Sequence, residues 1–139
     1  MTQVFADTAY WIAILNRHDQ LHSIAVQLSR TLQPSQIVTT ELVLIELLND
    51  FGSRSMNLRS TAMNSVIALQ NDPNVKIISQ TPERFKSAFS FYCKRPDKAW
   101  SLTDCLSFII MSEYKITDAL SYDQHFIQAG FNALMRAKN

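Results

Sequence analysis

The sequence predicts an α/β fold, a three-layer α/β/α sandwich with a central, mostly parallel sheet. Short apolar runs alternate along the chain with segments whose apolar residues recur at the helical period. Strands separated by helices pair in parallel through right-handed crossovers. The 139 residues, 47% hydrophobic and 18% charged, contain no repeat, low-complexity tract or long linker. We therefore expect residues 1–139 to form a single domain.

Five short strands are expected, each an apolar or β-branched run that ends at a turn signal or at an acid. The first ends at Asp7, and the third is bounded by Pro73 and Pro82. In chain order the expected strands are residues 4–6, 37–39, 75–78, 119–122 and 131–134.

Helices are expected between these strands. Gly52 and Gly130 supply C-terminal stops, and Pro82 stands where the first position of a helix tolerates proline. The expected helices are residues 8–15, a segment from about 19 that ends before Pro34, 41–51, 60–69, a segment from Pro82, 103–113 and 124–129. Residues 136–139 are expected to fray.

Composition excludes several classes of protein. Thirteen Lys and Arg against twelve Asp and Glu leave a net charge of +1, so any affinity for nucleic acid must come from local patches. Cys93 and Cys105 lack metal-ligand spacing and are interpreted as reduced core thiols, which fits the cytoplasm. No export signal is expected at residues 1–7, and no apolar stretch reaches the roughly 20 residues of a membrane span.

Three acids are predicted to meet at one edge of the sheet. Asp7 follows the first strand, Asp123 follows the fourth, and Asp104 opens the helix that leads into the fourth. Ligands of open parallel sheets bind beyond the carboxyl ends of the strands, where these acids lie. Each also has a structural alternative, because Asp7 and Asp123 can cap helices and Asp104 fits a capping box with Ser101.

Glu46 is the acid that helix capping explains least well. It lies about one and a half turns into the helix after the second strand, beside Leu42 and Val43, with no basic residue within a turn. A charge on such an apolar helix needs a partner, and we expect a cation. Converging carboxylates without Lys or Arg favour Mg²⁺ or Mn²⁺, whether one ion or two. Such an ion supports hydrolysis of phosphodiesters.

Four sequence blocks carry a resemblance to a known family. They are Val4-Phe5-Ala6-Asp7-Thr8, the segment from Val38 to Glu46, Trp100-Ser101-Leu102-Thr103-Asp104-Cys105, and the segment from Ala119 to Phe131. In this order and spacing the chain resembles the PIN-domain nucleases, and among them the VapC-type toxins, over nearly its full length.

The resemblance implies a metal-dependent endoribonuclease, the toxin of a toxin–antitoxin pair. It implies metal-binding and catalytic acids at Asp7, Glu46, Asp104 and Asp123, and RNA products with 5′-phosphate and 3′-hydroxyl ends. Ser121 falls where such proteins carry a Thr or Ser near the metal, so it is expected to orient a carboxylate or a water. A homodimer and a small antitoxin partner are implied as well.

Some neighbouring residues are less clear. Many relatives carry Arg where this chain has Gln124, so a phosphate contact there is in doubt. Lys94, Arg95 and Lys98 are candidate substrate contacts, with Trp100 either a stacking platform for bases or a core residue. We expect His125 to be a structural residue outside the catalytic set. Asp97 and Asp118 are interpreted as surface charges.

Other functions remain as alternatives. A PIN-like module could bind RNA or protein without cleaving. A phosphoacceptor receiver-like domain would need an acidic pair at the first strand, whereas Asp7 lies between Ala6 and Thr8. A haloacid-dehalogenase-like phosphatase would need a second acid at Ala9.

Overall fold

The computed structural model describes residues 2–32 and 35–136 of the chain. Its centre is a five-stranded sheet in the order β3-β2-β1-β4-β5, and every neighbouring pair of strands is parallel. The strands are β1 (Gln3–Ala6), β2 (Gln36–Thr40), β3 (Val75–Ile78), β4 (Asp118–Leu120) and β5 (Asn132–Ala133). The expected sheet is confirmed, and it is wholly rather than mostly parallel.

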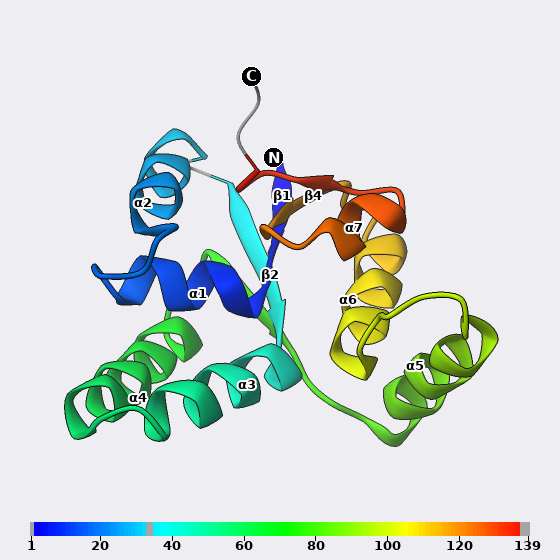
Figure 1. The fold of residues 1–139 in the computed structure, drawn as a ribbon, viewed down its shortest axis with the longest axis horizontal. Helices are drawn as coiled ribbons and strands as arrows, with labels where there is room; N and C mark the ends of the chain where they lie inside the picture. The colour runs from blue at the N-terminus through cyan, green and yellow to red at the C-terminus, as the bar shows by residue number, and fades with distance from the viewer. Residues whose placement is uncertain (1, 33–34, 137–139) are drawn as a thin grey trace.

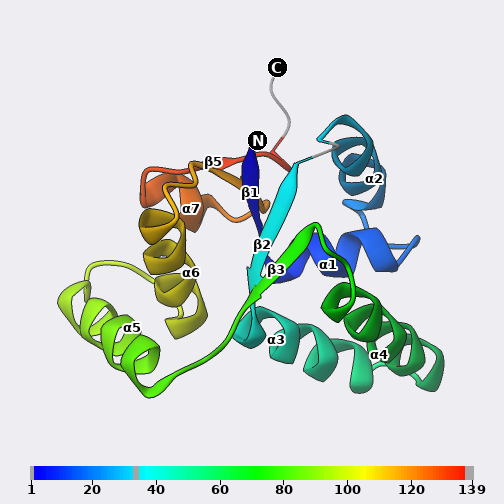
Figure 2. The same ribbon diagram turned by 180° about the vertical axis from the view of Figure 1, so that it is seen from behind.

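Helices cover the sheet on both sides. They are α1 (Thr8–Leu15), α2 (His22–Thr31), α3 (Glu41–Gly52), α4 (Met56–Gln70), α5 (Pro82–Lys94), α6 (Leu102–Glu113) and α7 (Gln124–Gln128). Helices α1 to α4 lie on one side of the strands and α5 to α7 on the other (Figure 1). The view from behind shows the same division (Figure 2). The three-layer α/β/α prediction is confirmed.

The observed helix boundaries agree better with local capping hydrogen bonds than with the boundaries expected from the apolar periodicity of the sequence. Helix α4 begins at Met56 and not at Ser60, because the Ser55 hydroxyl caps it by accepting a bond from the backbone N–H of Leu58. Gly130 has a φ of 95°, so it supplies the left-handed residue that ends the turn after α7. Helix α2 ends at Thr31, before Pro34 as expected. Of residues 136–139, which are expected to fray, only Arg136 is among the described residues, and its guanidinium carbon lies 4.7 Å from the centre of the Tyr122 ring.

The central strand β1 carries the first of the predicted site acids to the sheet edge. Val4, Phe5 and Ala6 are completely buried. Phe5 pairs with Val38 of β2 on one side and with Ala119 of β4 on the other. Burial on both faces and both edges fixes this strand firmly, so the residue that follows it has a well-defined position.

One prediction about the cysteines is wrong. Cys105 is buried in α6 as expected, but Cys93 is exposed near the end of α5. Helix α5 buries only Ala88 completely, so most of its residues face outward. Among the described residues, no helix combines the length and the apolar character that crossing a bilayer requires.

Candidate metal centre

Asp7 lies at the carboxyl end of β1, where the chain passes into α1. It occupies the N-cap position of α1, but its side chain makes no capping hydrogen bond. The residue is only 8% exposed. Burial is the largest cause that raises the pKa of Asp7 from 3.8 to about 7, and the charges of Asp104 and Glu46 act in the same direction. The capping interpretation of this carboxylate is therefore wrong.

Ser121 connects Asp7 to the end of the neighbouring strand. Its hydroxyl donates a 2.9 Å hydrogen bond to Oδ2 of Asp7 and accepts a 3.1 Å bond from the backbone N–H of Asp123. The side chain is completely buried. A single hydroxyl thus fixes one carboxylate after β1 and the backbone of a second acid after β4.

Glu46 projects from the first half of α3. Its Oε1 accepts a 2.7 Å hydrogen bond from the Thr8 hydroxyl, and its Oε2 accepts a 2.8 Å bond from the Thr103 hydroxyl. It is half-buried, and within residues 2–32 and 35–136 it forms no ion pair. Hydroxyl groups therefore contact both carboxylate oxygens of Glu46, and no cationic side chain of the described residues pairs with it.

Asp104 and Asp123 do cap helices. Asp104 and Ser101 form a capping box at the start of α6, with bonds of 2.9 and 3.1 Å between each side chain and the other residue's backbone N–H. Asp123 caps α7 by accepting a 2.9 Å bond from the backbone N–H of His125. Burial is the largest cause of a raised pKa at Asp104. For these two acids the capping interpretation is confirmed, and it leaves part of each carboxylate available.

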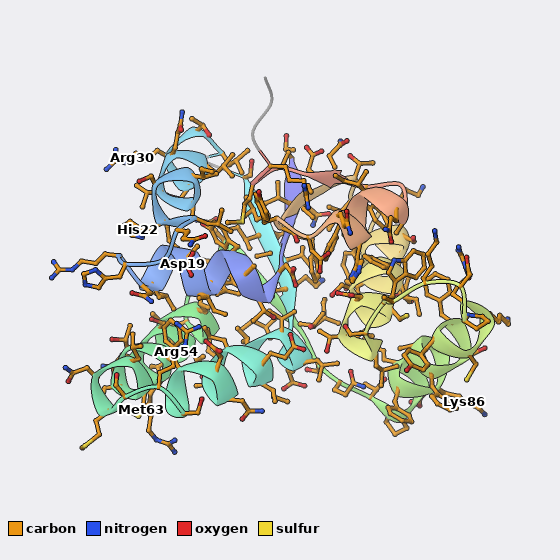
Figure 3. The ribbon with its side chains drawn as sticks, in the orientation of Figure 1. Asp19, His22, Arg30, Arg54, Met63 and Lys86 are labelled. Carbon is orange, nitrogen blue, oxygen red and sulfur yellow. The ribbon has the colours of Figure 1, made fainter. Side chains whose placement is uncertain are left out.

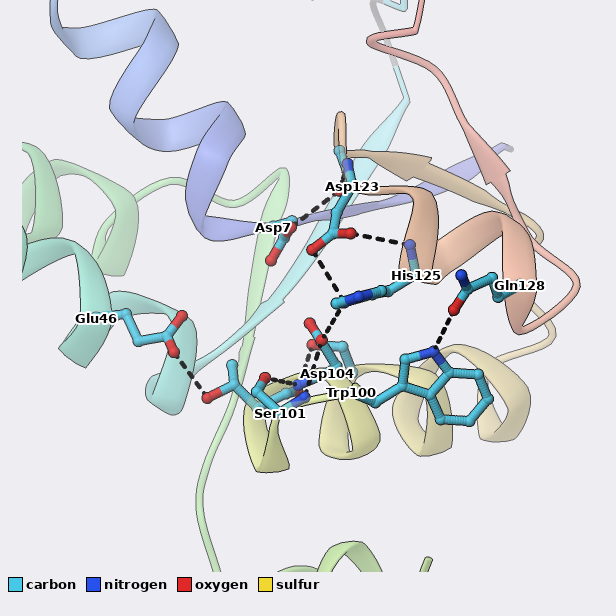
Figure 4. A network of polar contacts seen from close by, with 11 residues as sticks. Asp7, Glu46, Trp100, Ser101, Asp104, Asp123, His125 and Gln128 are labelled. Carbon is cyan, nitrogen blue, oxygen red and sulfur yellow. Dashed lines mark hydrogen bonds and ion pairs between the residues drawn. The ribbon is translucent and has the colours of Figure 1, made fainter. Parts of the chain in front are cut away.

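The four predicted acids face one space. Figure 4 shows the carboxylates of Asp7, Glu46, Asp104 and Asp123 directed toward the region between the strand ends and helices α3 and α6. The tightest part of this region consists of Asp104, Asp123 and His125, whose candidate ligand atoms all lie within 4.8 Å of one another. Asp7 and Glu46 border this group, and both Glu46 and Asp104 contribute repulsion at Asp7.

His125 is the residue that the sequence interpretation placed outside the site. Its Nδ1 lies 3.0 Å from Oδ2 of Asp104 and 3.3 Å from Oδ2 of Asp123. The Asp-x-His spacing was the available signal, because the first turn of a short helix after β4 directs residue 125 back toward its own N-cap. No local sequence pattern indicates the contact with Asp104, because Asp104 lies 21 positions earlier in the chain.

The segment before α6 does not provide the base-stacking surface considered from the sequence. Trp100 is 4% exposed, and its indole N–H donates a 3.0 Å hydrogen bond to Gln128, so it is a core residue. Arg95 lies over that ring at 4.8 Å and makes two 3.0 Å hydrogen bonds to exposed Asp97. Asp118 stands at the start of β4, away from the acids.

The donors suit a hard divalent cation. Four carboxylates supply oxygen ligands, and no Lys or Arg in the described ranges forms an ion pair with any of them. The pKa of Asp7, raised mainly by burial, marks a carboxyl whose charged form is only partly compensated by its hydrogen bonds from the Thr8 backbone and Ser121. A bound cation would supply that compensation, so the residues present fit a Mg²⁺ or Mn²⁺ ion.

Comparisons with known proteins agree with this geometry. The family model of the PIN domain matches residues 4–132. The "23S rRNA-specific endonuclease VapC20" of Mycobacterium tuberculosis, found in two strains, is 26% identical over 128 residues, which are 92% of this chain and 95% of the relative. The crystal structure of M. tuberculosis VapC20, described as a "Sarcin-Ricin loop cleaving toxin", superimposes on this chain with a TM-score of 0.84 at 25% identity. That similarity covers 94% of this chain and 97% of the solved one.

Proposed function

This chain belongs to the PIN-domain family, and on that premise we propose that it is a Mg²⁺- or Mn²⁺-dependent endoribonuclease that hydrolyses RNA phosphodiesters. One observation carries the proposal. Asp7 is buried at the carboxyl edge of the sheet with its pKa raised to about 7, facing other acids and no basic partner among the described residues. A buried acid in that state costs stability unless the site binds a cation.

Asp7, Glu46, Asp104 and Asp123 would hold the ion. When bound, such an ion activates a water molecule and offsets the charge that develops on a phosphodiester. The sequence pattern and the geometry are both compatible with one ion or two.

The protein's own residues orient the acids. Ser121 holds Asp7 through Oδ2, while Thr8 and Thr103 fix the two oxygens of Glu46. These bonds leave each carboxylate little rotational freedom, so the oxygen cluster is formed in advance. The fixed orientation supports positioning of a phosphodiester over the acids.

The relative named as a 23S rRNA-specific endonuclease makes RNA the expected substrate, and we propose that this chain acts as the toxin of a toxin–antitoxin pair in the cytoplasm. A cognate small antitoxin would then be a protein partner. The alternative is a PIN-like module that binds RNA or protein without cleavage, although all four acids are present in this chain.

Two exposed apolar surfaces support the proposal of protein partners, a homodimer among them. The first, on α5, consists of Phe85, Phe89 and Tyr92, each about half exposed, with the two phenylalanine rings stacked at 6.1 Å. The second, on α4, consists of Met56, Met63 and Ile67, each at least half exposed, and Figure 3 shows Met63 pointing outward from the fold. Clustered exposed aromatic residues are typical of association surfaces.

Cleavage by the purified full chain tests the proposed function. An RNA carrying a sarcin–ricin loop is the first substrate to use, because the relative of known structure is described as a sarcin–ricin loop cleaving toxin. We expect cleavage with Mn²⁺ or Mg²⁺, none with EDTA, and none by Asp7→Asn or Asp104→Asn. A folded wild-type protein that cleaves no RNA with either ion would favour the binding-module alternative.

A further inference from the structure

His125 joins two of the acids that come from different helices. Its Nδ1 lies 3.0 Å from Oδ2 of Asp104, at the start of α6, and 3.3 Å from Oδ2 of Asp123, at the start of α7. Figure 4 shows the imidazole between these two carboxylates. Neither the family match nor the relatives' names assign a role to this side chain.

We infer that His125 is a positioning residue of the proposed metal centre, holding the carboxylates of Asp104 and Asp123 in place for the ion. This inference rests on the proposed function. Two carboxylates at such short range repel each other, and the charge of Asp123 acts on Asp104. An N–H group placed between them offsets that repulsion and keeps both side chains turned toward the site.

The backbone that carries this ring is held by the core. Phe126, the next residue, is completely buried and packs against Phe108 at 5.0 Å and Phe5 at 6.4 Å. The backbone N–H of His125 is bound to Asp123. The imidazole is therefore carried by a well-fixed helix start, which limits how far it can follow a carboxylate that rotates away.

The hydrogen bonds leave one oxygen of Asp104 available. Oδ2 of Asp104 accepts from both the Ser101 backbone N–H and the His125 ring, whereas Oδ1 accepts no bond from the described residues. This division turns Oδ1 toward the shared space while Oδ2 anchors the side chain. A neutral imidazole with its proton on Nδ1 is sufficient for this role.

The test measures Mn²⁺ binding to the full chain by titration calorimetry. We expect His125→Ala to weaken Mn²⁺ binding about 10- to 100-fold, the range typical of lost partners of metal ligands. His125→Asn should recover most of the affinity, because its amide N–H can take the place of Nδ1–H. Gln128→Ala is the matched control, since Gln128 lies on the same helix and contacts only Trp100 among the polar partners described. Melting temperatures without metal check that each variant folds.

Three results would overturn the inference. Mn²⁺ affinity of folded His125→Ala within about twofold of wild type would remove the positioning role alone. Nitrogen hyperfine coupling to bound Mn²⁺ that disappears in His125→Ala would make His125 a ligand and not a positioning residue. A wild-type protein that binds no divalent ion and cleaves RNA in EDTA would overturn the metal-dependent function and this inference together.

Discussion

The Ser121 hydroxyl donates a 2.9 Å hydrogen bond to Oδ2 of Asp7, joining the carboxyl ends of β4 and β1. The two residues are 114 positions apart. Burial raises the pKa of Asp7 to about 7, and hydrogen bonds from the Thr8 backbone and from the Ser121 hydroxyl act in the opposite direction. The ionisation of Asp7 therefore depends in part on Ser121, and so would the metal binding that we propose for this site.

Replacing Ser121 should shift the pH dependence of RNA cleavage. Ser121→Ala removes a bond to a charged acceptor, worth about 1.5–3 kcal/mol, which corresponds to roughly 10- to 100-fold in rate near pH 7. The pKa of Asp7 should rise further, so activity should recover at higher pH. The measurement is the pH profile of kcat/KM. Ser121→Thr keeps the hydroxyl and is the control; an unshifted profile in Ser121→Ala would refute the link.

The metal-free protein should lose stability as pH rises from about 4 to about 7. Unfolded Asp7 releases its proton near 3.8, whereas folded Asp7 keeps it until about 7. Between these values the folded state binds more protons, so stability falls with rising pH, by up to about 4 kcal/mol from this group. Asp7→Asn should remove that loss of stability. Urea unfolding at pH 5 and at pH 8 measures the free energy of unfolding at both ends of the decline.

The control for this experiment is Asp97→Asn. Asp97 is exposed and bonded to Arg95, so its removal should leave the decline between pH 5 and pH 8 intact. If the free energy of unfolding of Asp7→Asn declines with pH as steeply as that of wild type, the account of Asp7 is wrong.

Glu46 should require its two threonine partners. Thr103→Val keeps the shape of the side chain but removes the donor to Oε2, and Thr8→Val removes the donor to Oε1. Each change should lower kcat/KM about tenfold, because one hydrogen bond to a carboxylate is lost. The serine variants restore the hydroxyl and should restore activity in the same assay. Wild-type rates in both valine variants would mean that Glu46 needs no orientation.

Whether a feature of this site can be predicted from the sequence depends on how far apart along the chain its interacting residues lie. The strand–acid junction at Asp7 and the extent of helix α3 are predictable because apolar runs and turn signals are local. The apolar character of α3 on nearly every face suggests a fully buried helix, which is wrong, because Ile45 and Leu48 are exposed. The contacts of His125 with Asp104 and of Glu46 with Thr103 join distant segments, and no local pattern marks them. Cys93 was placed wrongly because α5 leaves much of its apolar surface exposed.

Self-association should depend on the α5 aromatic surface. Phe89→Glu places a charge among side chains that association would bury, and should weaken a dimer by at least about tenfold. Light scattering after size-exclusion chromatography measures the mass. Lys86→Glu changes charge on the same exposed helix without removing an aromatic ring and is the control. A wild-type protein that stays monomeric at high concentration would contradict the homodimer proposal.

Mapping RNA ends in cells tests most directly whether these four acids support hydrolysis of RNA. Wild type and Asp104→Asn are expressed side by side, and new 5′-phosphate ends are sequenced. The amide that replaces this carboxylate can still accept the Ser101 bond that caps α6, so the variant should fold while losing a proposed metal ligand. We predict growth arrest and discrete new 5′-phosphate ends with wild type and neither with the variant. The same ends in Asp104→Asn, or no new ends with wild type, would contradict the account.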